Sequence, residues 1–252
     1  MNGKAAHEKA QNGFNEHEIV SQFQERFTIF SKDEKNFENI TKNHTIVTEK
    51  RVPKVGVMLV GLGGNNGSTF VAGILANKRN VEFETKQGTQ KPNFYGSFTQ
   101  SATTHIGFKY DEADGLLKDV FKPINEILPM AHPCDFEVSG WDISDKNLYE
   151  ACKRAKVLEP DLIKKLKSEL EQIKPLKAAL NGDFIASNQS DRADNCFSGT
   201  NKEIVERLRA DIREMKGRTD KVIVLWSANT EQFLLPEIKD TDELKSMMER
   251  NI

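Results

Sequence analysis

Several features that identify protein classes are scarce in this sequence of 252 residues. Its three cysteines, Cys134, Cys152 and Cys196, are widely spaced and odd in number, which argues against a disulfide framework and favours a reducing compartment. The five histidines show no metal-ligand spacing with these cysteines, so we expect no structural metal. No apolar run approaches the roughly 20 residues that cross a bilayer, and the amino terminus lacks a signal-peptide pattern.

A strong charge of either sign is also missing, because the formal net charge is only -2. Bulk electrostatics therefore gives no reason for binding to nucleic acid or to an acidic membrane. Hydrophobic residues make up 37% of the chain and charged residues 29%, enough for one core beneath a well-charged surface. We expect a soluble, cytoplasmic protein with neither a nucleic-acid partner nor a membrane partner.

The composition changes near residue 55. Residues 1–54 are rich in Asn, Glu, Lys and Gln, and we predict an N-terminal arm that packs onto a core. Residues 55–252 are predicted to form the first part of an α/β domain. Within it, residues 85–110 have little periodicity and are expected to be irregular.

Apolar runs predict strands over residues 55–60, 136–142 and 222–226. Apolar side chains at helical spacing predict helices over residues 68–77, 148–155, 162–173 and 204–215. Gly217 is expected to end the helix over 204–215, and a further helix is expected from about residue 240. Strands that alternate with helices indicate a mainly parallel sheet with helices on both faces.

Three loops follow these strands: Gly61–Gly67, Asp142–Ser144 and Ser227–Thr230. Because the carboxyl ends of parallel strands share one edge of a sheet, we expect the three loops to converge there. Ligands of such sheets bind at this edge.

The first loop has the pattern Gly61-x-Gly63-x-x-x-Gly67, one residue longer than the usual dinucleotide fingerprint. Glycines between a buried strand and a helix let backbone N–H groups approach a phosphate along the helix dipole. Two interpretations are open, a pyrophosphate site and a purely structural turn.

Asp142 ends the second strand and is a candidate ligand for ribose hydroxyls. The alternative is a helix N-cap, a common role for Asp at such a position. We interpret Lys91 and Lys109 as solvated charges, and His105 and His132 as locally hydrogen-bonded side chains. Residue patterns alone thus indicate a dinucleotide-binding domain and leave the reaction open.

Several segments together resemble the eukaryotic myo-inositol-1-phosphate synthases. The residues that carry the resemblance are the glycine loop Leu59–Ser68 with its unusual Asn65-Asn66, then Pro92–Ser97, Ser139–Ile143, Asp183–Ala186 and Lys221–Thr230. The resemblance implies a Rossmann-like NAD-binding domain, incomplete in this sequence. It also implies the NAD-dependent isomerisation of glucose 6-phosphate to 1L-myo-inositol 1-phosphate.

The resemblance also assigns roles to individual residues. Gly64, Asn65, Asn66 and Gly67 are expected to cradle the pyrophosphate of NAD, and Asp142 to bind the adenosine ribose. The remaining expected cofactor contacts are Gln189, Arg192, Ala228, Asn229 and Thr230. Ser187 and Ser227 depart mildly from the family pattern, which commonly has Ala and Thr there.

In this family the catalytic lysines, the phosphate pocket and the subunit-association sheet lie in a second half that this sequence does not contain. We therefore expect no catalytic residue here, an inactive chain, and a homo-oligomer (a tetramer by family) only for a full-length protein. The alternative is a short product that binds NAD or pairs with full-length subunits without catalysis. Made alone, the chain is expected to fold poorly or self-associate.

Overall fold

A computed structural model describes residues 13–14, 16–32, 35–180 and 187–228 of the protein. The chain divides into two compact units, one from Met1–Val52 and Phe94–Met130 and the other from Pro53–Asn93 and Ala131–Ile252. Among the residues described, no helix is both long and apolar enough to cross a membrane. The proposed domains, 1–54 and 55–252, stay a prediction.

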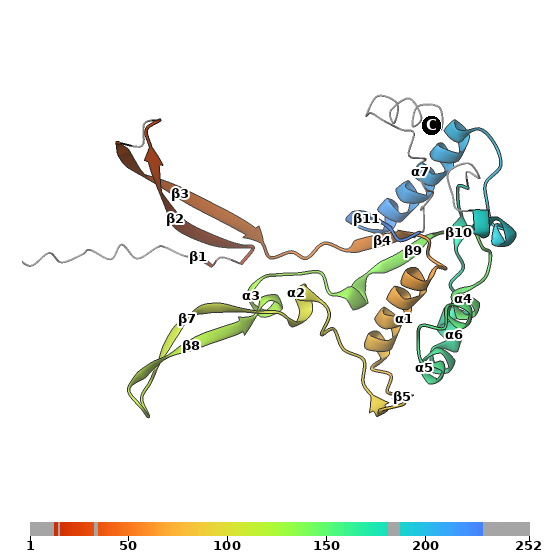
Figure 1. Ribbon diagram of the computed structural model, residues 1–252, viewed down its shortest axis with the longest axis horizontal. Helices are drawn as coiled ribbons and strands as arrows, with labels where there is room; N and C mark the ends of the chain where they lie inside the picture. The colour runs from red at the N-terminus through yellow and green to blue at the C-terminus, as the bar shows by residue number, and fades with distance from the viewer. Residues whose placement is uncertain (1–12, 15, 33–34, 181–186, 229–252) are drawn as a thin grey trace, which may run out of the picture. The chain divides into compact units, whose positions relative to one another are not determined.

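The first unit contains two antiparallel hairpins with largely exposed side chains (Figure 1). Short β1 pairs with β2, β2 pairs with β3 along its whole length, and β7 pairs with β8 through one bulge. The elements of this unit are β1 (Gly13–Phe14), β2 (Glu18–Phe30), β3 (Phe37–Glu49), α2 (Phe98–Ser101), β7 (Thr103–Asp111), β8 (Leu116–Pro123) and α3 (Ile124–Ile127).

The expectation that residues 85–110 are irregular was wrong. The segment contains β6 (Gly88–Gln90), which pairs with β5 (Phe83–Thr85), and most of β7. Apolar and polar side chains of β7 are exposed on both faces of its hairpin. Even so, Ile106, Phe108 and Tyr110 alternate with Gly107, Lys109 and Asp111, so β7 does have the period-2 pattern of a strand, which the prediction overlooked.

The second unit is built on a four-stranded sheet in the order β10-β9-β4-β11. All three pairings are parallel, which confirms the predicted α/β class. The strands are β4 (Val55–Val60), β9 (Glu137–Asp142), β10 (Leu176–Lys177) and β11 (Lys221–Trp226).

Helices cover both faces of this sheet, as predicted (Figure 1). On one face, Val55, Val57 and Leu59 of β4 pack against side chains of α1, α4, α5 and α6. Met58 points to the other face, where it packs with Trp141 and with α7 side chains. Successive residues of a strand point to opposite faces, so one short apolar run supplies both cores.

The predicted helices are present with changes at their ends. α1, α4 and α7 match the predicted segments, but the segment 162–173 forms two short helices that break at Leu166. The break preserves the apolar face, because Leu162, Leu166 and Leu170 are all buried. The helices are α1 (Asn65–Arg79), α4 (Leu148–Ala155), α5 (Pro160–Lys165), α6 (Lys167–Leu170) and α7 (Asn201–Arg218), with 3-10 turns η1 (Pro133–Asp135) and η2 (Ser187–Arg192). The helix expected from residue 240 lies outside the described residues.

Gly217 does not end α7, contrary to the prediction, since the helix continues to Arg218. The end is fixed instead by Thr219, whose hydroxyl donates to the Met215 carbonyl at 2.8 Å. The Asp220 N–H then donates to the Lys54 carbonyl at 2.9 Å and starts β11 beside β4. A side chain in the following loop thus does what the sequence pattern assigned to glycine.

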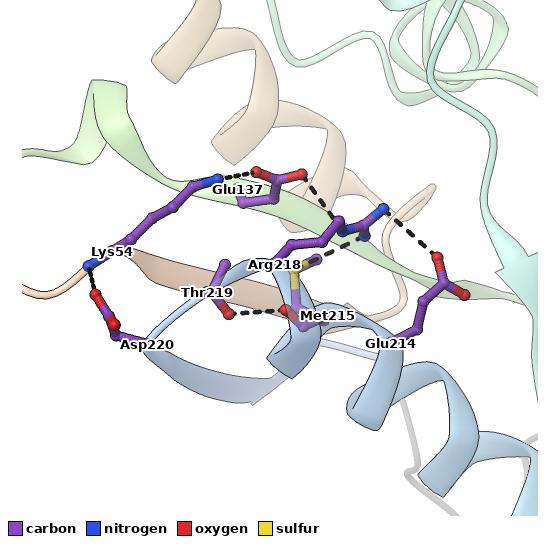
Figure 2. Close-up of polar contacts among 7 residues, drawn as sticks. All are labelled: Lys54, Glu137, Glu214, Met215, Arg218, Thr219 and Asp220. Atoms are coloured by element: carbon purple, nitrogen blue, oxygen red, sulfur yellow. Dashed lines mark hydrogen bonds and ion pairs between the residues drawn. The ribbon is translucent and has the colours of Figure 1, made fainter.

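Ion pairs join the amino ends of the strands, at the edge opposite the loops (Figure 2). Glu137 accepts from the Lys54 ammonium at 3.0 Å and pairs with the Arg218 guanidinium at 3.6 Å. Arg218 also pairs with Glu214 at 3.5 Å, and the Lys54 N–H donates to the Asp220 carboxylate at 2.9 Å. This network connects β4, β9 and the α7–β11 turn.

The network predicts that the free energy of unfolding depends weakly on pH in the acidic range. The Lys54 ammonium is the main cause that holds the pKa of Glu137 below its usual value near 4.5. A depressed folded-state pKa adds stability above the unfolded pKa, and this stability is lost as the pH falls through the folded pKa. We expect Glu137→Gln to lower the unfolding free energy by up to about 1 kcal/mol at pH 7, as for half-exposed pairs.

Urea unfolding at several pH values measures this effect, with Glu171→Gln, an exposed glutamate of the same unit, as the control. The stabilities of the unchanged chain and of Glu137→Gln should converge below about pH 4.5. A gap that stays constant down to pH 3 contradicts the assignment.

Candidate functional site

The glycine loop turns directly after β4 and is fixed by the neighbouring strand β9. The N–H groups of Gly61 and Leu62 both donate to the Trp141 carbonyl, at 2.8 and 3.0 Å. Gly61 has φ +91°, a left-handed conformation that favours glycine. The Gly64 N–H then donates to the Gly61 carbonyl at 3.0 Å and closes the turn.

Helix α1 begins at Asn65 with no side chain capping its amino end and no acidic residue in its first turn. Its first hydrogen bond runs from the Ser68 N–H to the Gly64 carbonyl at 2.9 Å. The N–H groups of Asn65, Asn66 and Gly67 have no acceptor within the part of the chain that the structure describes. Three unused donors at the positive end of a helix form a site suited to an anion.

Gly67 is required for this arrangement, because the helix starts against the loop. A Cβ atom on Gly67 would lie 2.5 Å from the Gly61 carbonyl oxygen and would also collide with the Leu62 carbonyl. Both obstacles are backbone atoms, which cannot move away as a flexible side chain would. The third glycine of the predicted pattern therefore allows the close approach of helix and loop.

Asp142 lies beside this loop, at the carboxyl end of β9, and is only 4% exposed. One carboxylate oxygen accepts from the Gly63 N–H at 2.9 Å, and the other accepts from the Ser144 N–H at 3.0 Å. The alternative of a helix N-cap was wrong, since the Asn147 side chain caps α4 by accepting from the Glu150 N–H at 3.0 Å. A carboxylate oxygen has two lone pairs, so both oxygens of Asp142 keep capacity for ligand hydroxyls.

The loop after β11 reaches the same place. Ser227 donates to the Val60 carbonyl through its N–H at 2.9 Å and through its hydroxyl at 3.0 Å. A Cβ atom on Gly61 would lie 3.0 Å from the backbone N and Cα of Ala228. Ala228 is therefore in place next to the glycine loop, while Asn229 and Thr230 lie outside the described residues. The described parts of the three loops converge as predicted.

Gln189 and Arg192 face each other within η2, where the Arg192 Nε donates to the Gln189 side-chain oxygen at 2.8 Å. The chain that follows is tied to the end of β9 by Asn195. The Asn195 N–H donates to the Ile143 carbonyl at 2.8 Å, and its side-chain amide donates to the Asp142 carbonyl at 3.0 Å. The predicted contacts in η2 thus belong to a segment anchored next to Asp142.

A family model described as myo-inositol-1-phosphate synthase matches residues 55–251. The chain belongs to the myo-inositol-1-phosphate synthase family. The family model is one of an NAD-binding domain, so NAD is the cofactor of the family.

Individual members of the synthase family agree with this assignment. Inositol-3-phosphate synthase of Saccharomyces cerevisiae is 48% identical over 207 residues, which are 77% of this chain and 38% of that protein. Isozyme 1 of Arabidopsis thaliana is 44% identical over 211 residues, 83% of this chain and 40% of that protein. The crystal structure of the Caenorhabditis elegans synthase superposes with a TM-score of 0.79 at 41% identity, covering 96% of this chain and 48% of that one. The chain thus spans less than half the length of these synthases.

Two residues of this synthase-family site were not found by sequence reasoning. The Arg154 guanidinium donates to the Gly63 carbonyl at 2.6 Å, and the buried Asn195 amide holds the end of β9. Arg154 is a basic residue in the last turn of a helix, which reads as an ordinary solvated charge. Both contacts join residues far apart in the chain, so no local sequence pattern predicts them.

The other candidate residues make contacts that need no ligand. Lys91 forms an exposed ion pair with Glu82 at 2.9 Å, as its interpretation as a solvated charge expected. His105 pairs with Asp119 at 2.9 Å, and the His132 ring accepts from the Cys134 N–H. The three cysteines are free thiols, and burial raises the pKa of Cys152. In the described residues, no group of three His, Cys, Asp or Glu side chains could hold a metal ion.

Proposed function

We propose that this chain binds NAD and supplies the cofactor-binding part of an inositol-3-phosphate synthase. The observation that carries the proposal is the uncapped amino end of α1, with three unused N–H donors, beside the buried carboxylate of Asp142. A diphosphate needs such donors, and ribose hydroxyls need such a carboxylate.

The residues take separate parts in this proposal. The N–H groups of Asn65, Asn66 and Gly67 bind the pyrophosphate, and Gly64, whose own N–H is used in the turn, lets it approach. Asp142 accepts hydrogen bonds from the adenosine ribose. The remaining proposed cofactor contacts are Gln189, Arg192, Ala228, Asn229 and Thr230.

The proposed reaction of the complete enzyme follows from the family. Its substrate is glucose 6-phosphate and its product is 1L-myo-inositol 1-phosphate. NAD, when bound, supplies a hydride acceptor and then a hydride donor, so no net oxidation results. The part of this chain is to bind and orient the cofactor at the carboxyl edge of the sheet.

We further propose that the complete enzyme is a homo-oligomer. The hairpin of β7 and β8 supports this, because large apolar side chains are exposed along it, among them Phe108 at 64% and Leu117 at 67%. Contiguous exposed apolar surface is typical of protein interfaces.

Replacing Asp142 with Ala tests the cofactor proposal. We expect NAD affinity to fall by about 1.5–3 kcal/mol, roughly 10-fold to 150-fold, the range for hydrogen bonds to a charged group. Calorimetric titration of NAD into the two proteins measures the loss, and a thermal melt reports stability in parallel. Asp145→Ala is the matched control, since Asp145 follows the same strand but is exposed.

The result that contradicts the ribose role is unchanged NAD affinity together with a lower melting temperature. In that case the carboxylate serves only to hold the glycine loop. If the unchanged chain shows no NAD binding, the proposed function itself fails.

The alternative is a product that binds NAD or pairs with complete subunits without catalysis. This alternative is supported by the coverage, because the chain matches less than half the length of these relatives. Both proposals predict that the chain alone is inactive. Formation of inositol phosphate on incubation with glucose 6-phosphate and NAD would refute that expectation and exclude the non-catalytic alternative.

A further inference from the structure

The peptide groups of the glycine loop are held by two side chains of opposite charge from outside the loop. The Gly63 N–H donates to the Asp142 carboxylate at 2.9 Å, and the Gly63 carbonyl accepts from the Arg154 guanidinium at 2.6 Å. The next N–H, that of Gly64, donates to the Gly61 carbonyl. The peptide between Gly63 and Gly64 is thus fixed at its oxygen and at its nitrogen.

The position of Arg154 is set by the packing of α4 against α1. Leu148, Ala151 and Cys152 of α4 are at most 1% exposed and belong to the same core as α1. The Cys152 thiol lies 3.9 Å from the Ser68 carbonyl, in the first turns of α1. The last turn of α4 therefore lies next to the glycine loop.

Arg154 carries a charge that no acidic side chain neutralises. Among the described residues, no carboxylate forms an ion pair with its guanidinium, whose contact is the Gly63 carbonyl. Most other arginines described in this unit do have such partners, as Arg79 does in Glu169 and Arg218 in Glu137. An arginine that is bonded to a neutral carbonyl keeps its positive charge and its other N–H donors available to a second ligand.

We propose that Arg154 is a positioning residue of the cofactor site that favours the anionic part of the dinucleotide. It holds the Gly63 carbonyl towards α4, so that this oxygen does not turn towards the phosphates. Its charge adds to that of the α1 amino end, and both attract the diphosphate. The inference rests on the proposed NAD function and adds a residue to it.

The experiment compares Arg154→Met, Arg154→Lys and the matched control Lys153→Met in the 252-residue chain. Lys153 stands in the same helical turn with the same charge, but its ammonium lies over the Tyr149 ring at 5.4 Å. Dissociation constants for NAD and for adenosine, which has no phosphate, are measured by calorimetry and by ligand-observed NMR. The NAD titration is repeated at low and high salt.

We expect Arg154→Met to weaken NAD binding about tenfold and adenosine binding less than twofold, because a hydrogen bond and a charge near the diphosphate are lost. The loss for NAD should shrink at high salt, which screens the charge. Arg154→Lys should weaken NAD binding about threefold, because lysine keeps the charge but lacks the planar donor group. Lys153→Met should bind both ligands as the unchanged chain does.

Two results overturn the inference while the proposed function stands. One is NAD affinity unchanged in Arg154→Met; the other is an equal loss for NAD and adenosine, as a purely structural contact would give. If Arg154→Met does not fold, Arg154→Lys is the test. The role of Arg154 is then refuted if Arg154→Lys binds NAD as tightly as the unchanged chain does at low salt. No NAD binding by the unchanged chain refutes the proposed function and the role of Arg154 with it.

Discussion

Gly140→Ala should abolish cooperative folding of the sheet unit. Gly140 pairs with Leu59 across the two central strands, β9 and β4. A Cβ atom on Gly140 would lie 2.7 Å from the Leu59 backbone nitrogen and closer still to its carbonyl oxygen. Relief requires the two strands to separate, which breaks their hydrogen bonds and opens both cores.

We expect the loss to exceed about 4 kcal/mol, a size that single substitutions reach only by such mechanisms. A domain of ordinary stability has about 5–15 kcal/mol in total, so most of it would be lost. Asp142 lies two residues further along β9, so NAD binding should disappear as well.

Urea unfolding followed by circular dichroism measures this effect, with Gly73→Ala as the matched control. Gly73 lies inside α1, and a Cβ atom there would meet nothing within 4 Å. That exchange should stabilise the chain by about 0.5–1 kcal/mol, because alanine loses less backbone entropy in a helix. A cooperative transition of Gly140→Ala within 1 kcal/mol of the unchanged chain would show that β4 and β9 accommodate a methyl group.

Sequence reasoning succeeded where local patterns have a physical cause. The run at β4 predicts a strand buried on both faces, and the glycines after it predict a tight turn into α1. Both follow from residues that are neighbours in the chain. The convergence of the loops after β4, β9 and β11 followed from parallel topology alone.

It failed where distant residues decide. The contact of Asp142 with the glycine loop spans 79 positions and that of Arg154 spans 91, so no window of sequence contains both partners. The N-cap alternative for Asp142 could be excluded only by the structure, in which Asn147 caps α4. Strand β7 was missed although Ile106, Phe108 and Tyr110 alternate with Gly107, Lys109 and Asp111, because the Gly, Thr, Ser and Pro residues of its surroundings suggested an irregular segment.

The chain should self-associate through β11. This strand stands at the end of the order β10-β9-β4-β11 and pairs only with β4 among the described strands. Its apolar side chains are largely exposed: Ile223 at 52%, Val224 at 47%, Leu225 at 44% and Trp226 at 62%. An apolar strand with an unpaired edge is a template for pairing with another chain.

The substitution Ile223→Lys should prevent this association, because a charge on an edge strand is costly to bury between two chains. Val157→Lys is the matched control, since Val157 is 56% exposed in the loop after α4, away from any strand edge. NAD should have a smaller effect. At 100 times its dissociation constant it adds about 2.7 kcal/mol to the folded state but covers no part of β11.

Size-exclusion chromatography with light scattering, over a range of concentrations and with or without NAD, measures the assembly. The unchanged chain and Val157→Lys should show a mass that rises with concentration, whereas Ile223→Lys should move towards the monomer. A monomeric unchanged chain with a cooperative heat transition in the absence of NAD would refute the prediction. Because burial of exposed apolar area drives such association, a monomer would mean that the apolar side chains of β11 are covered within one chain.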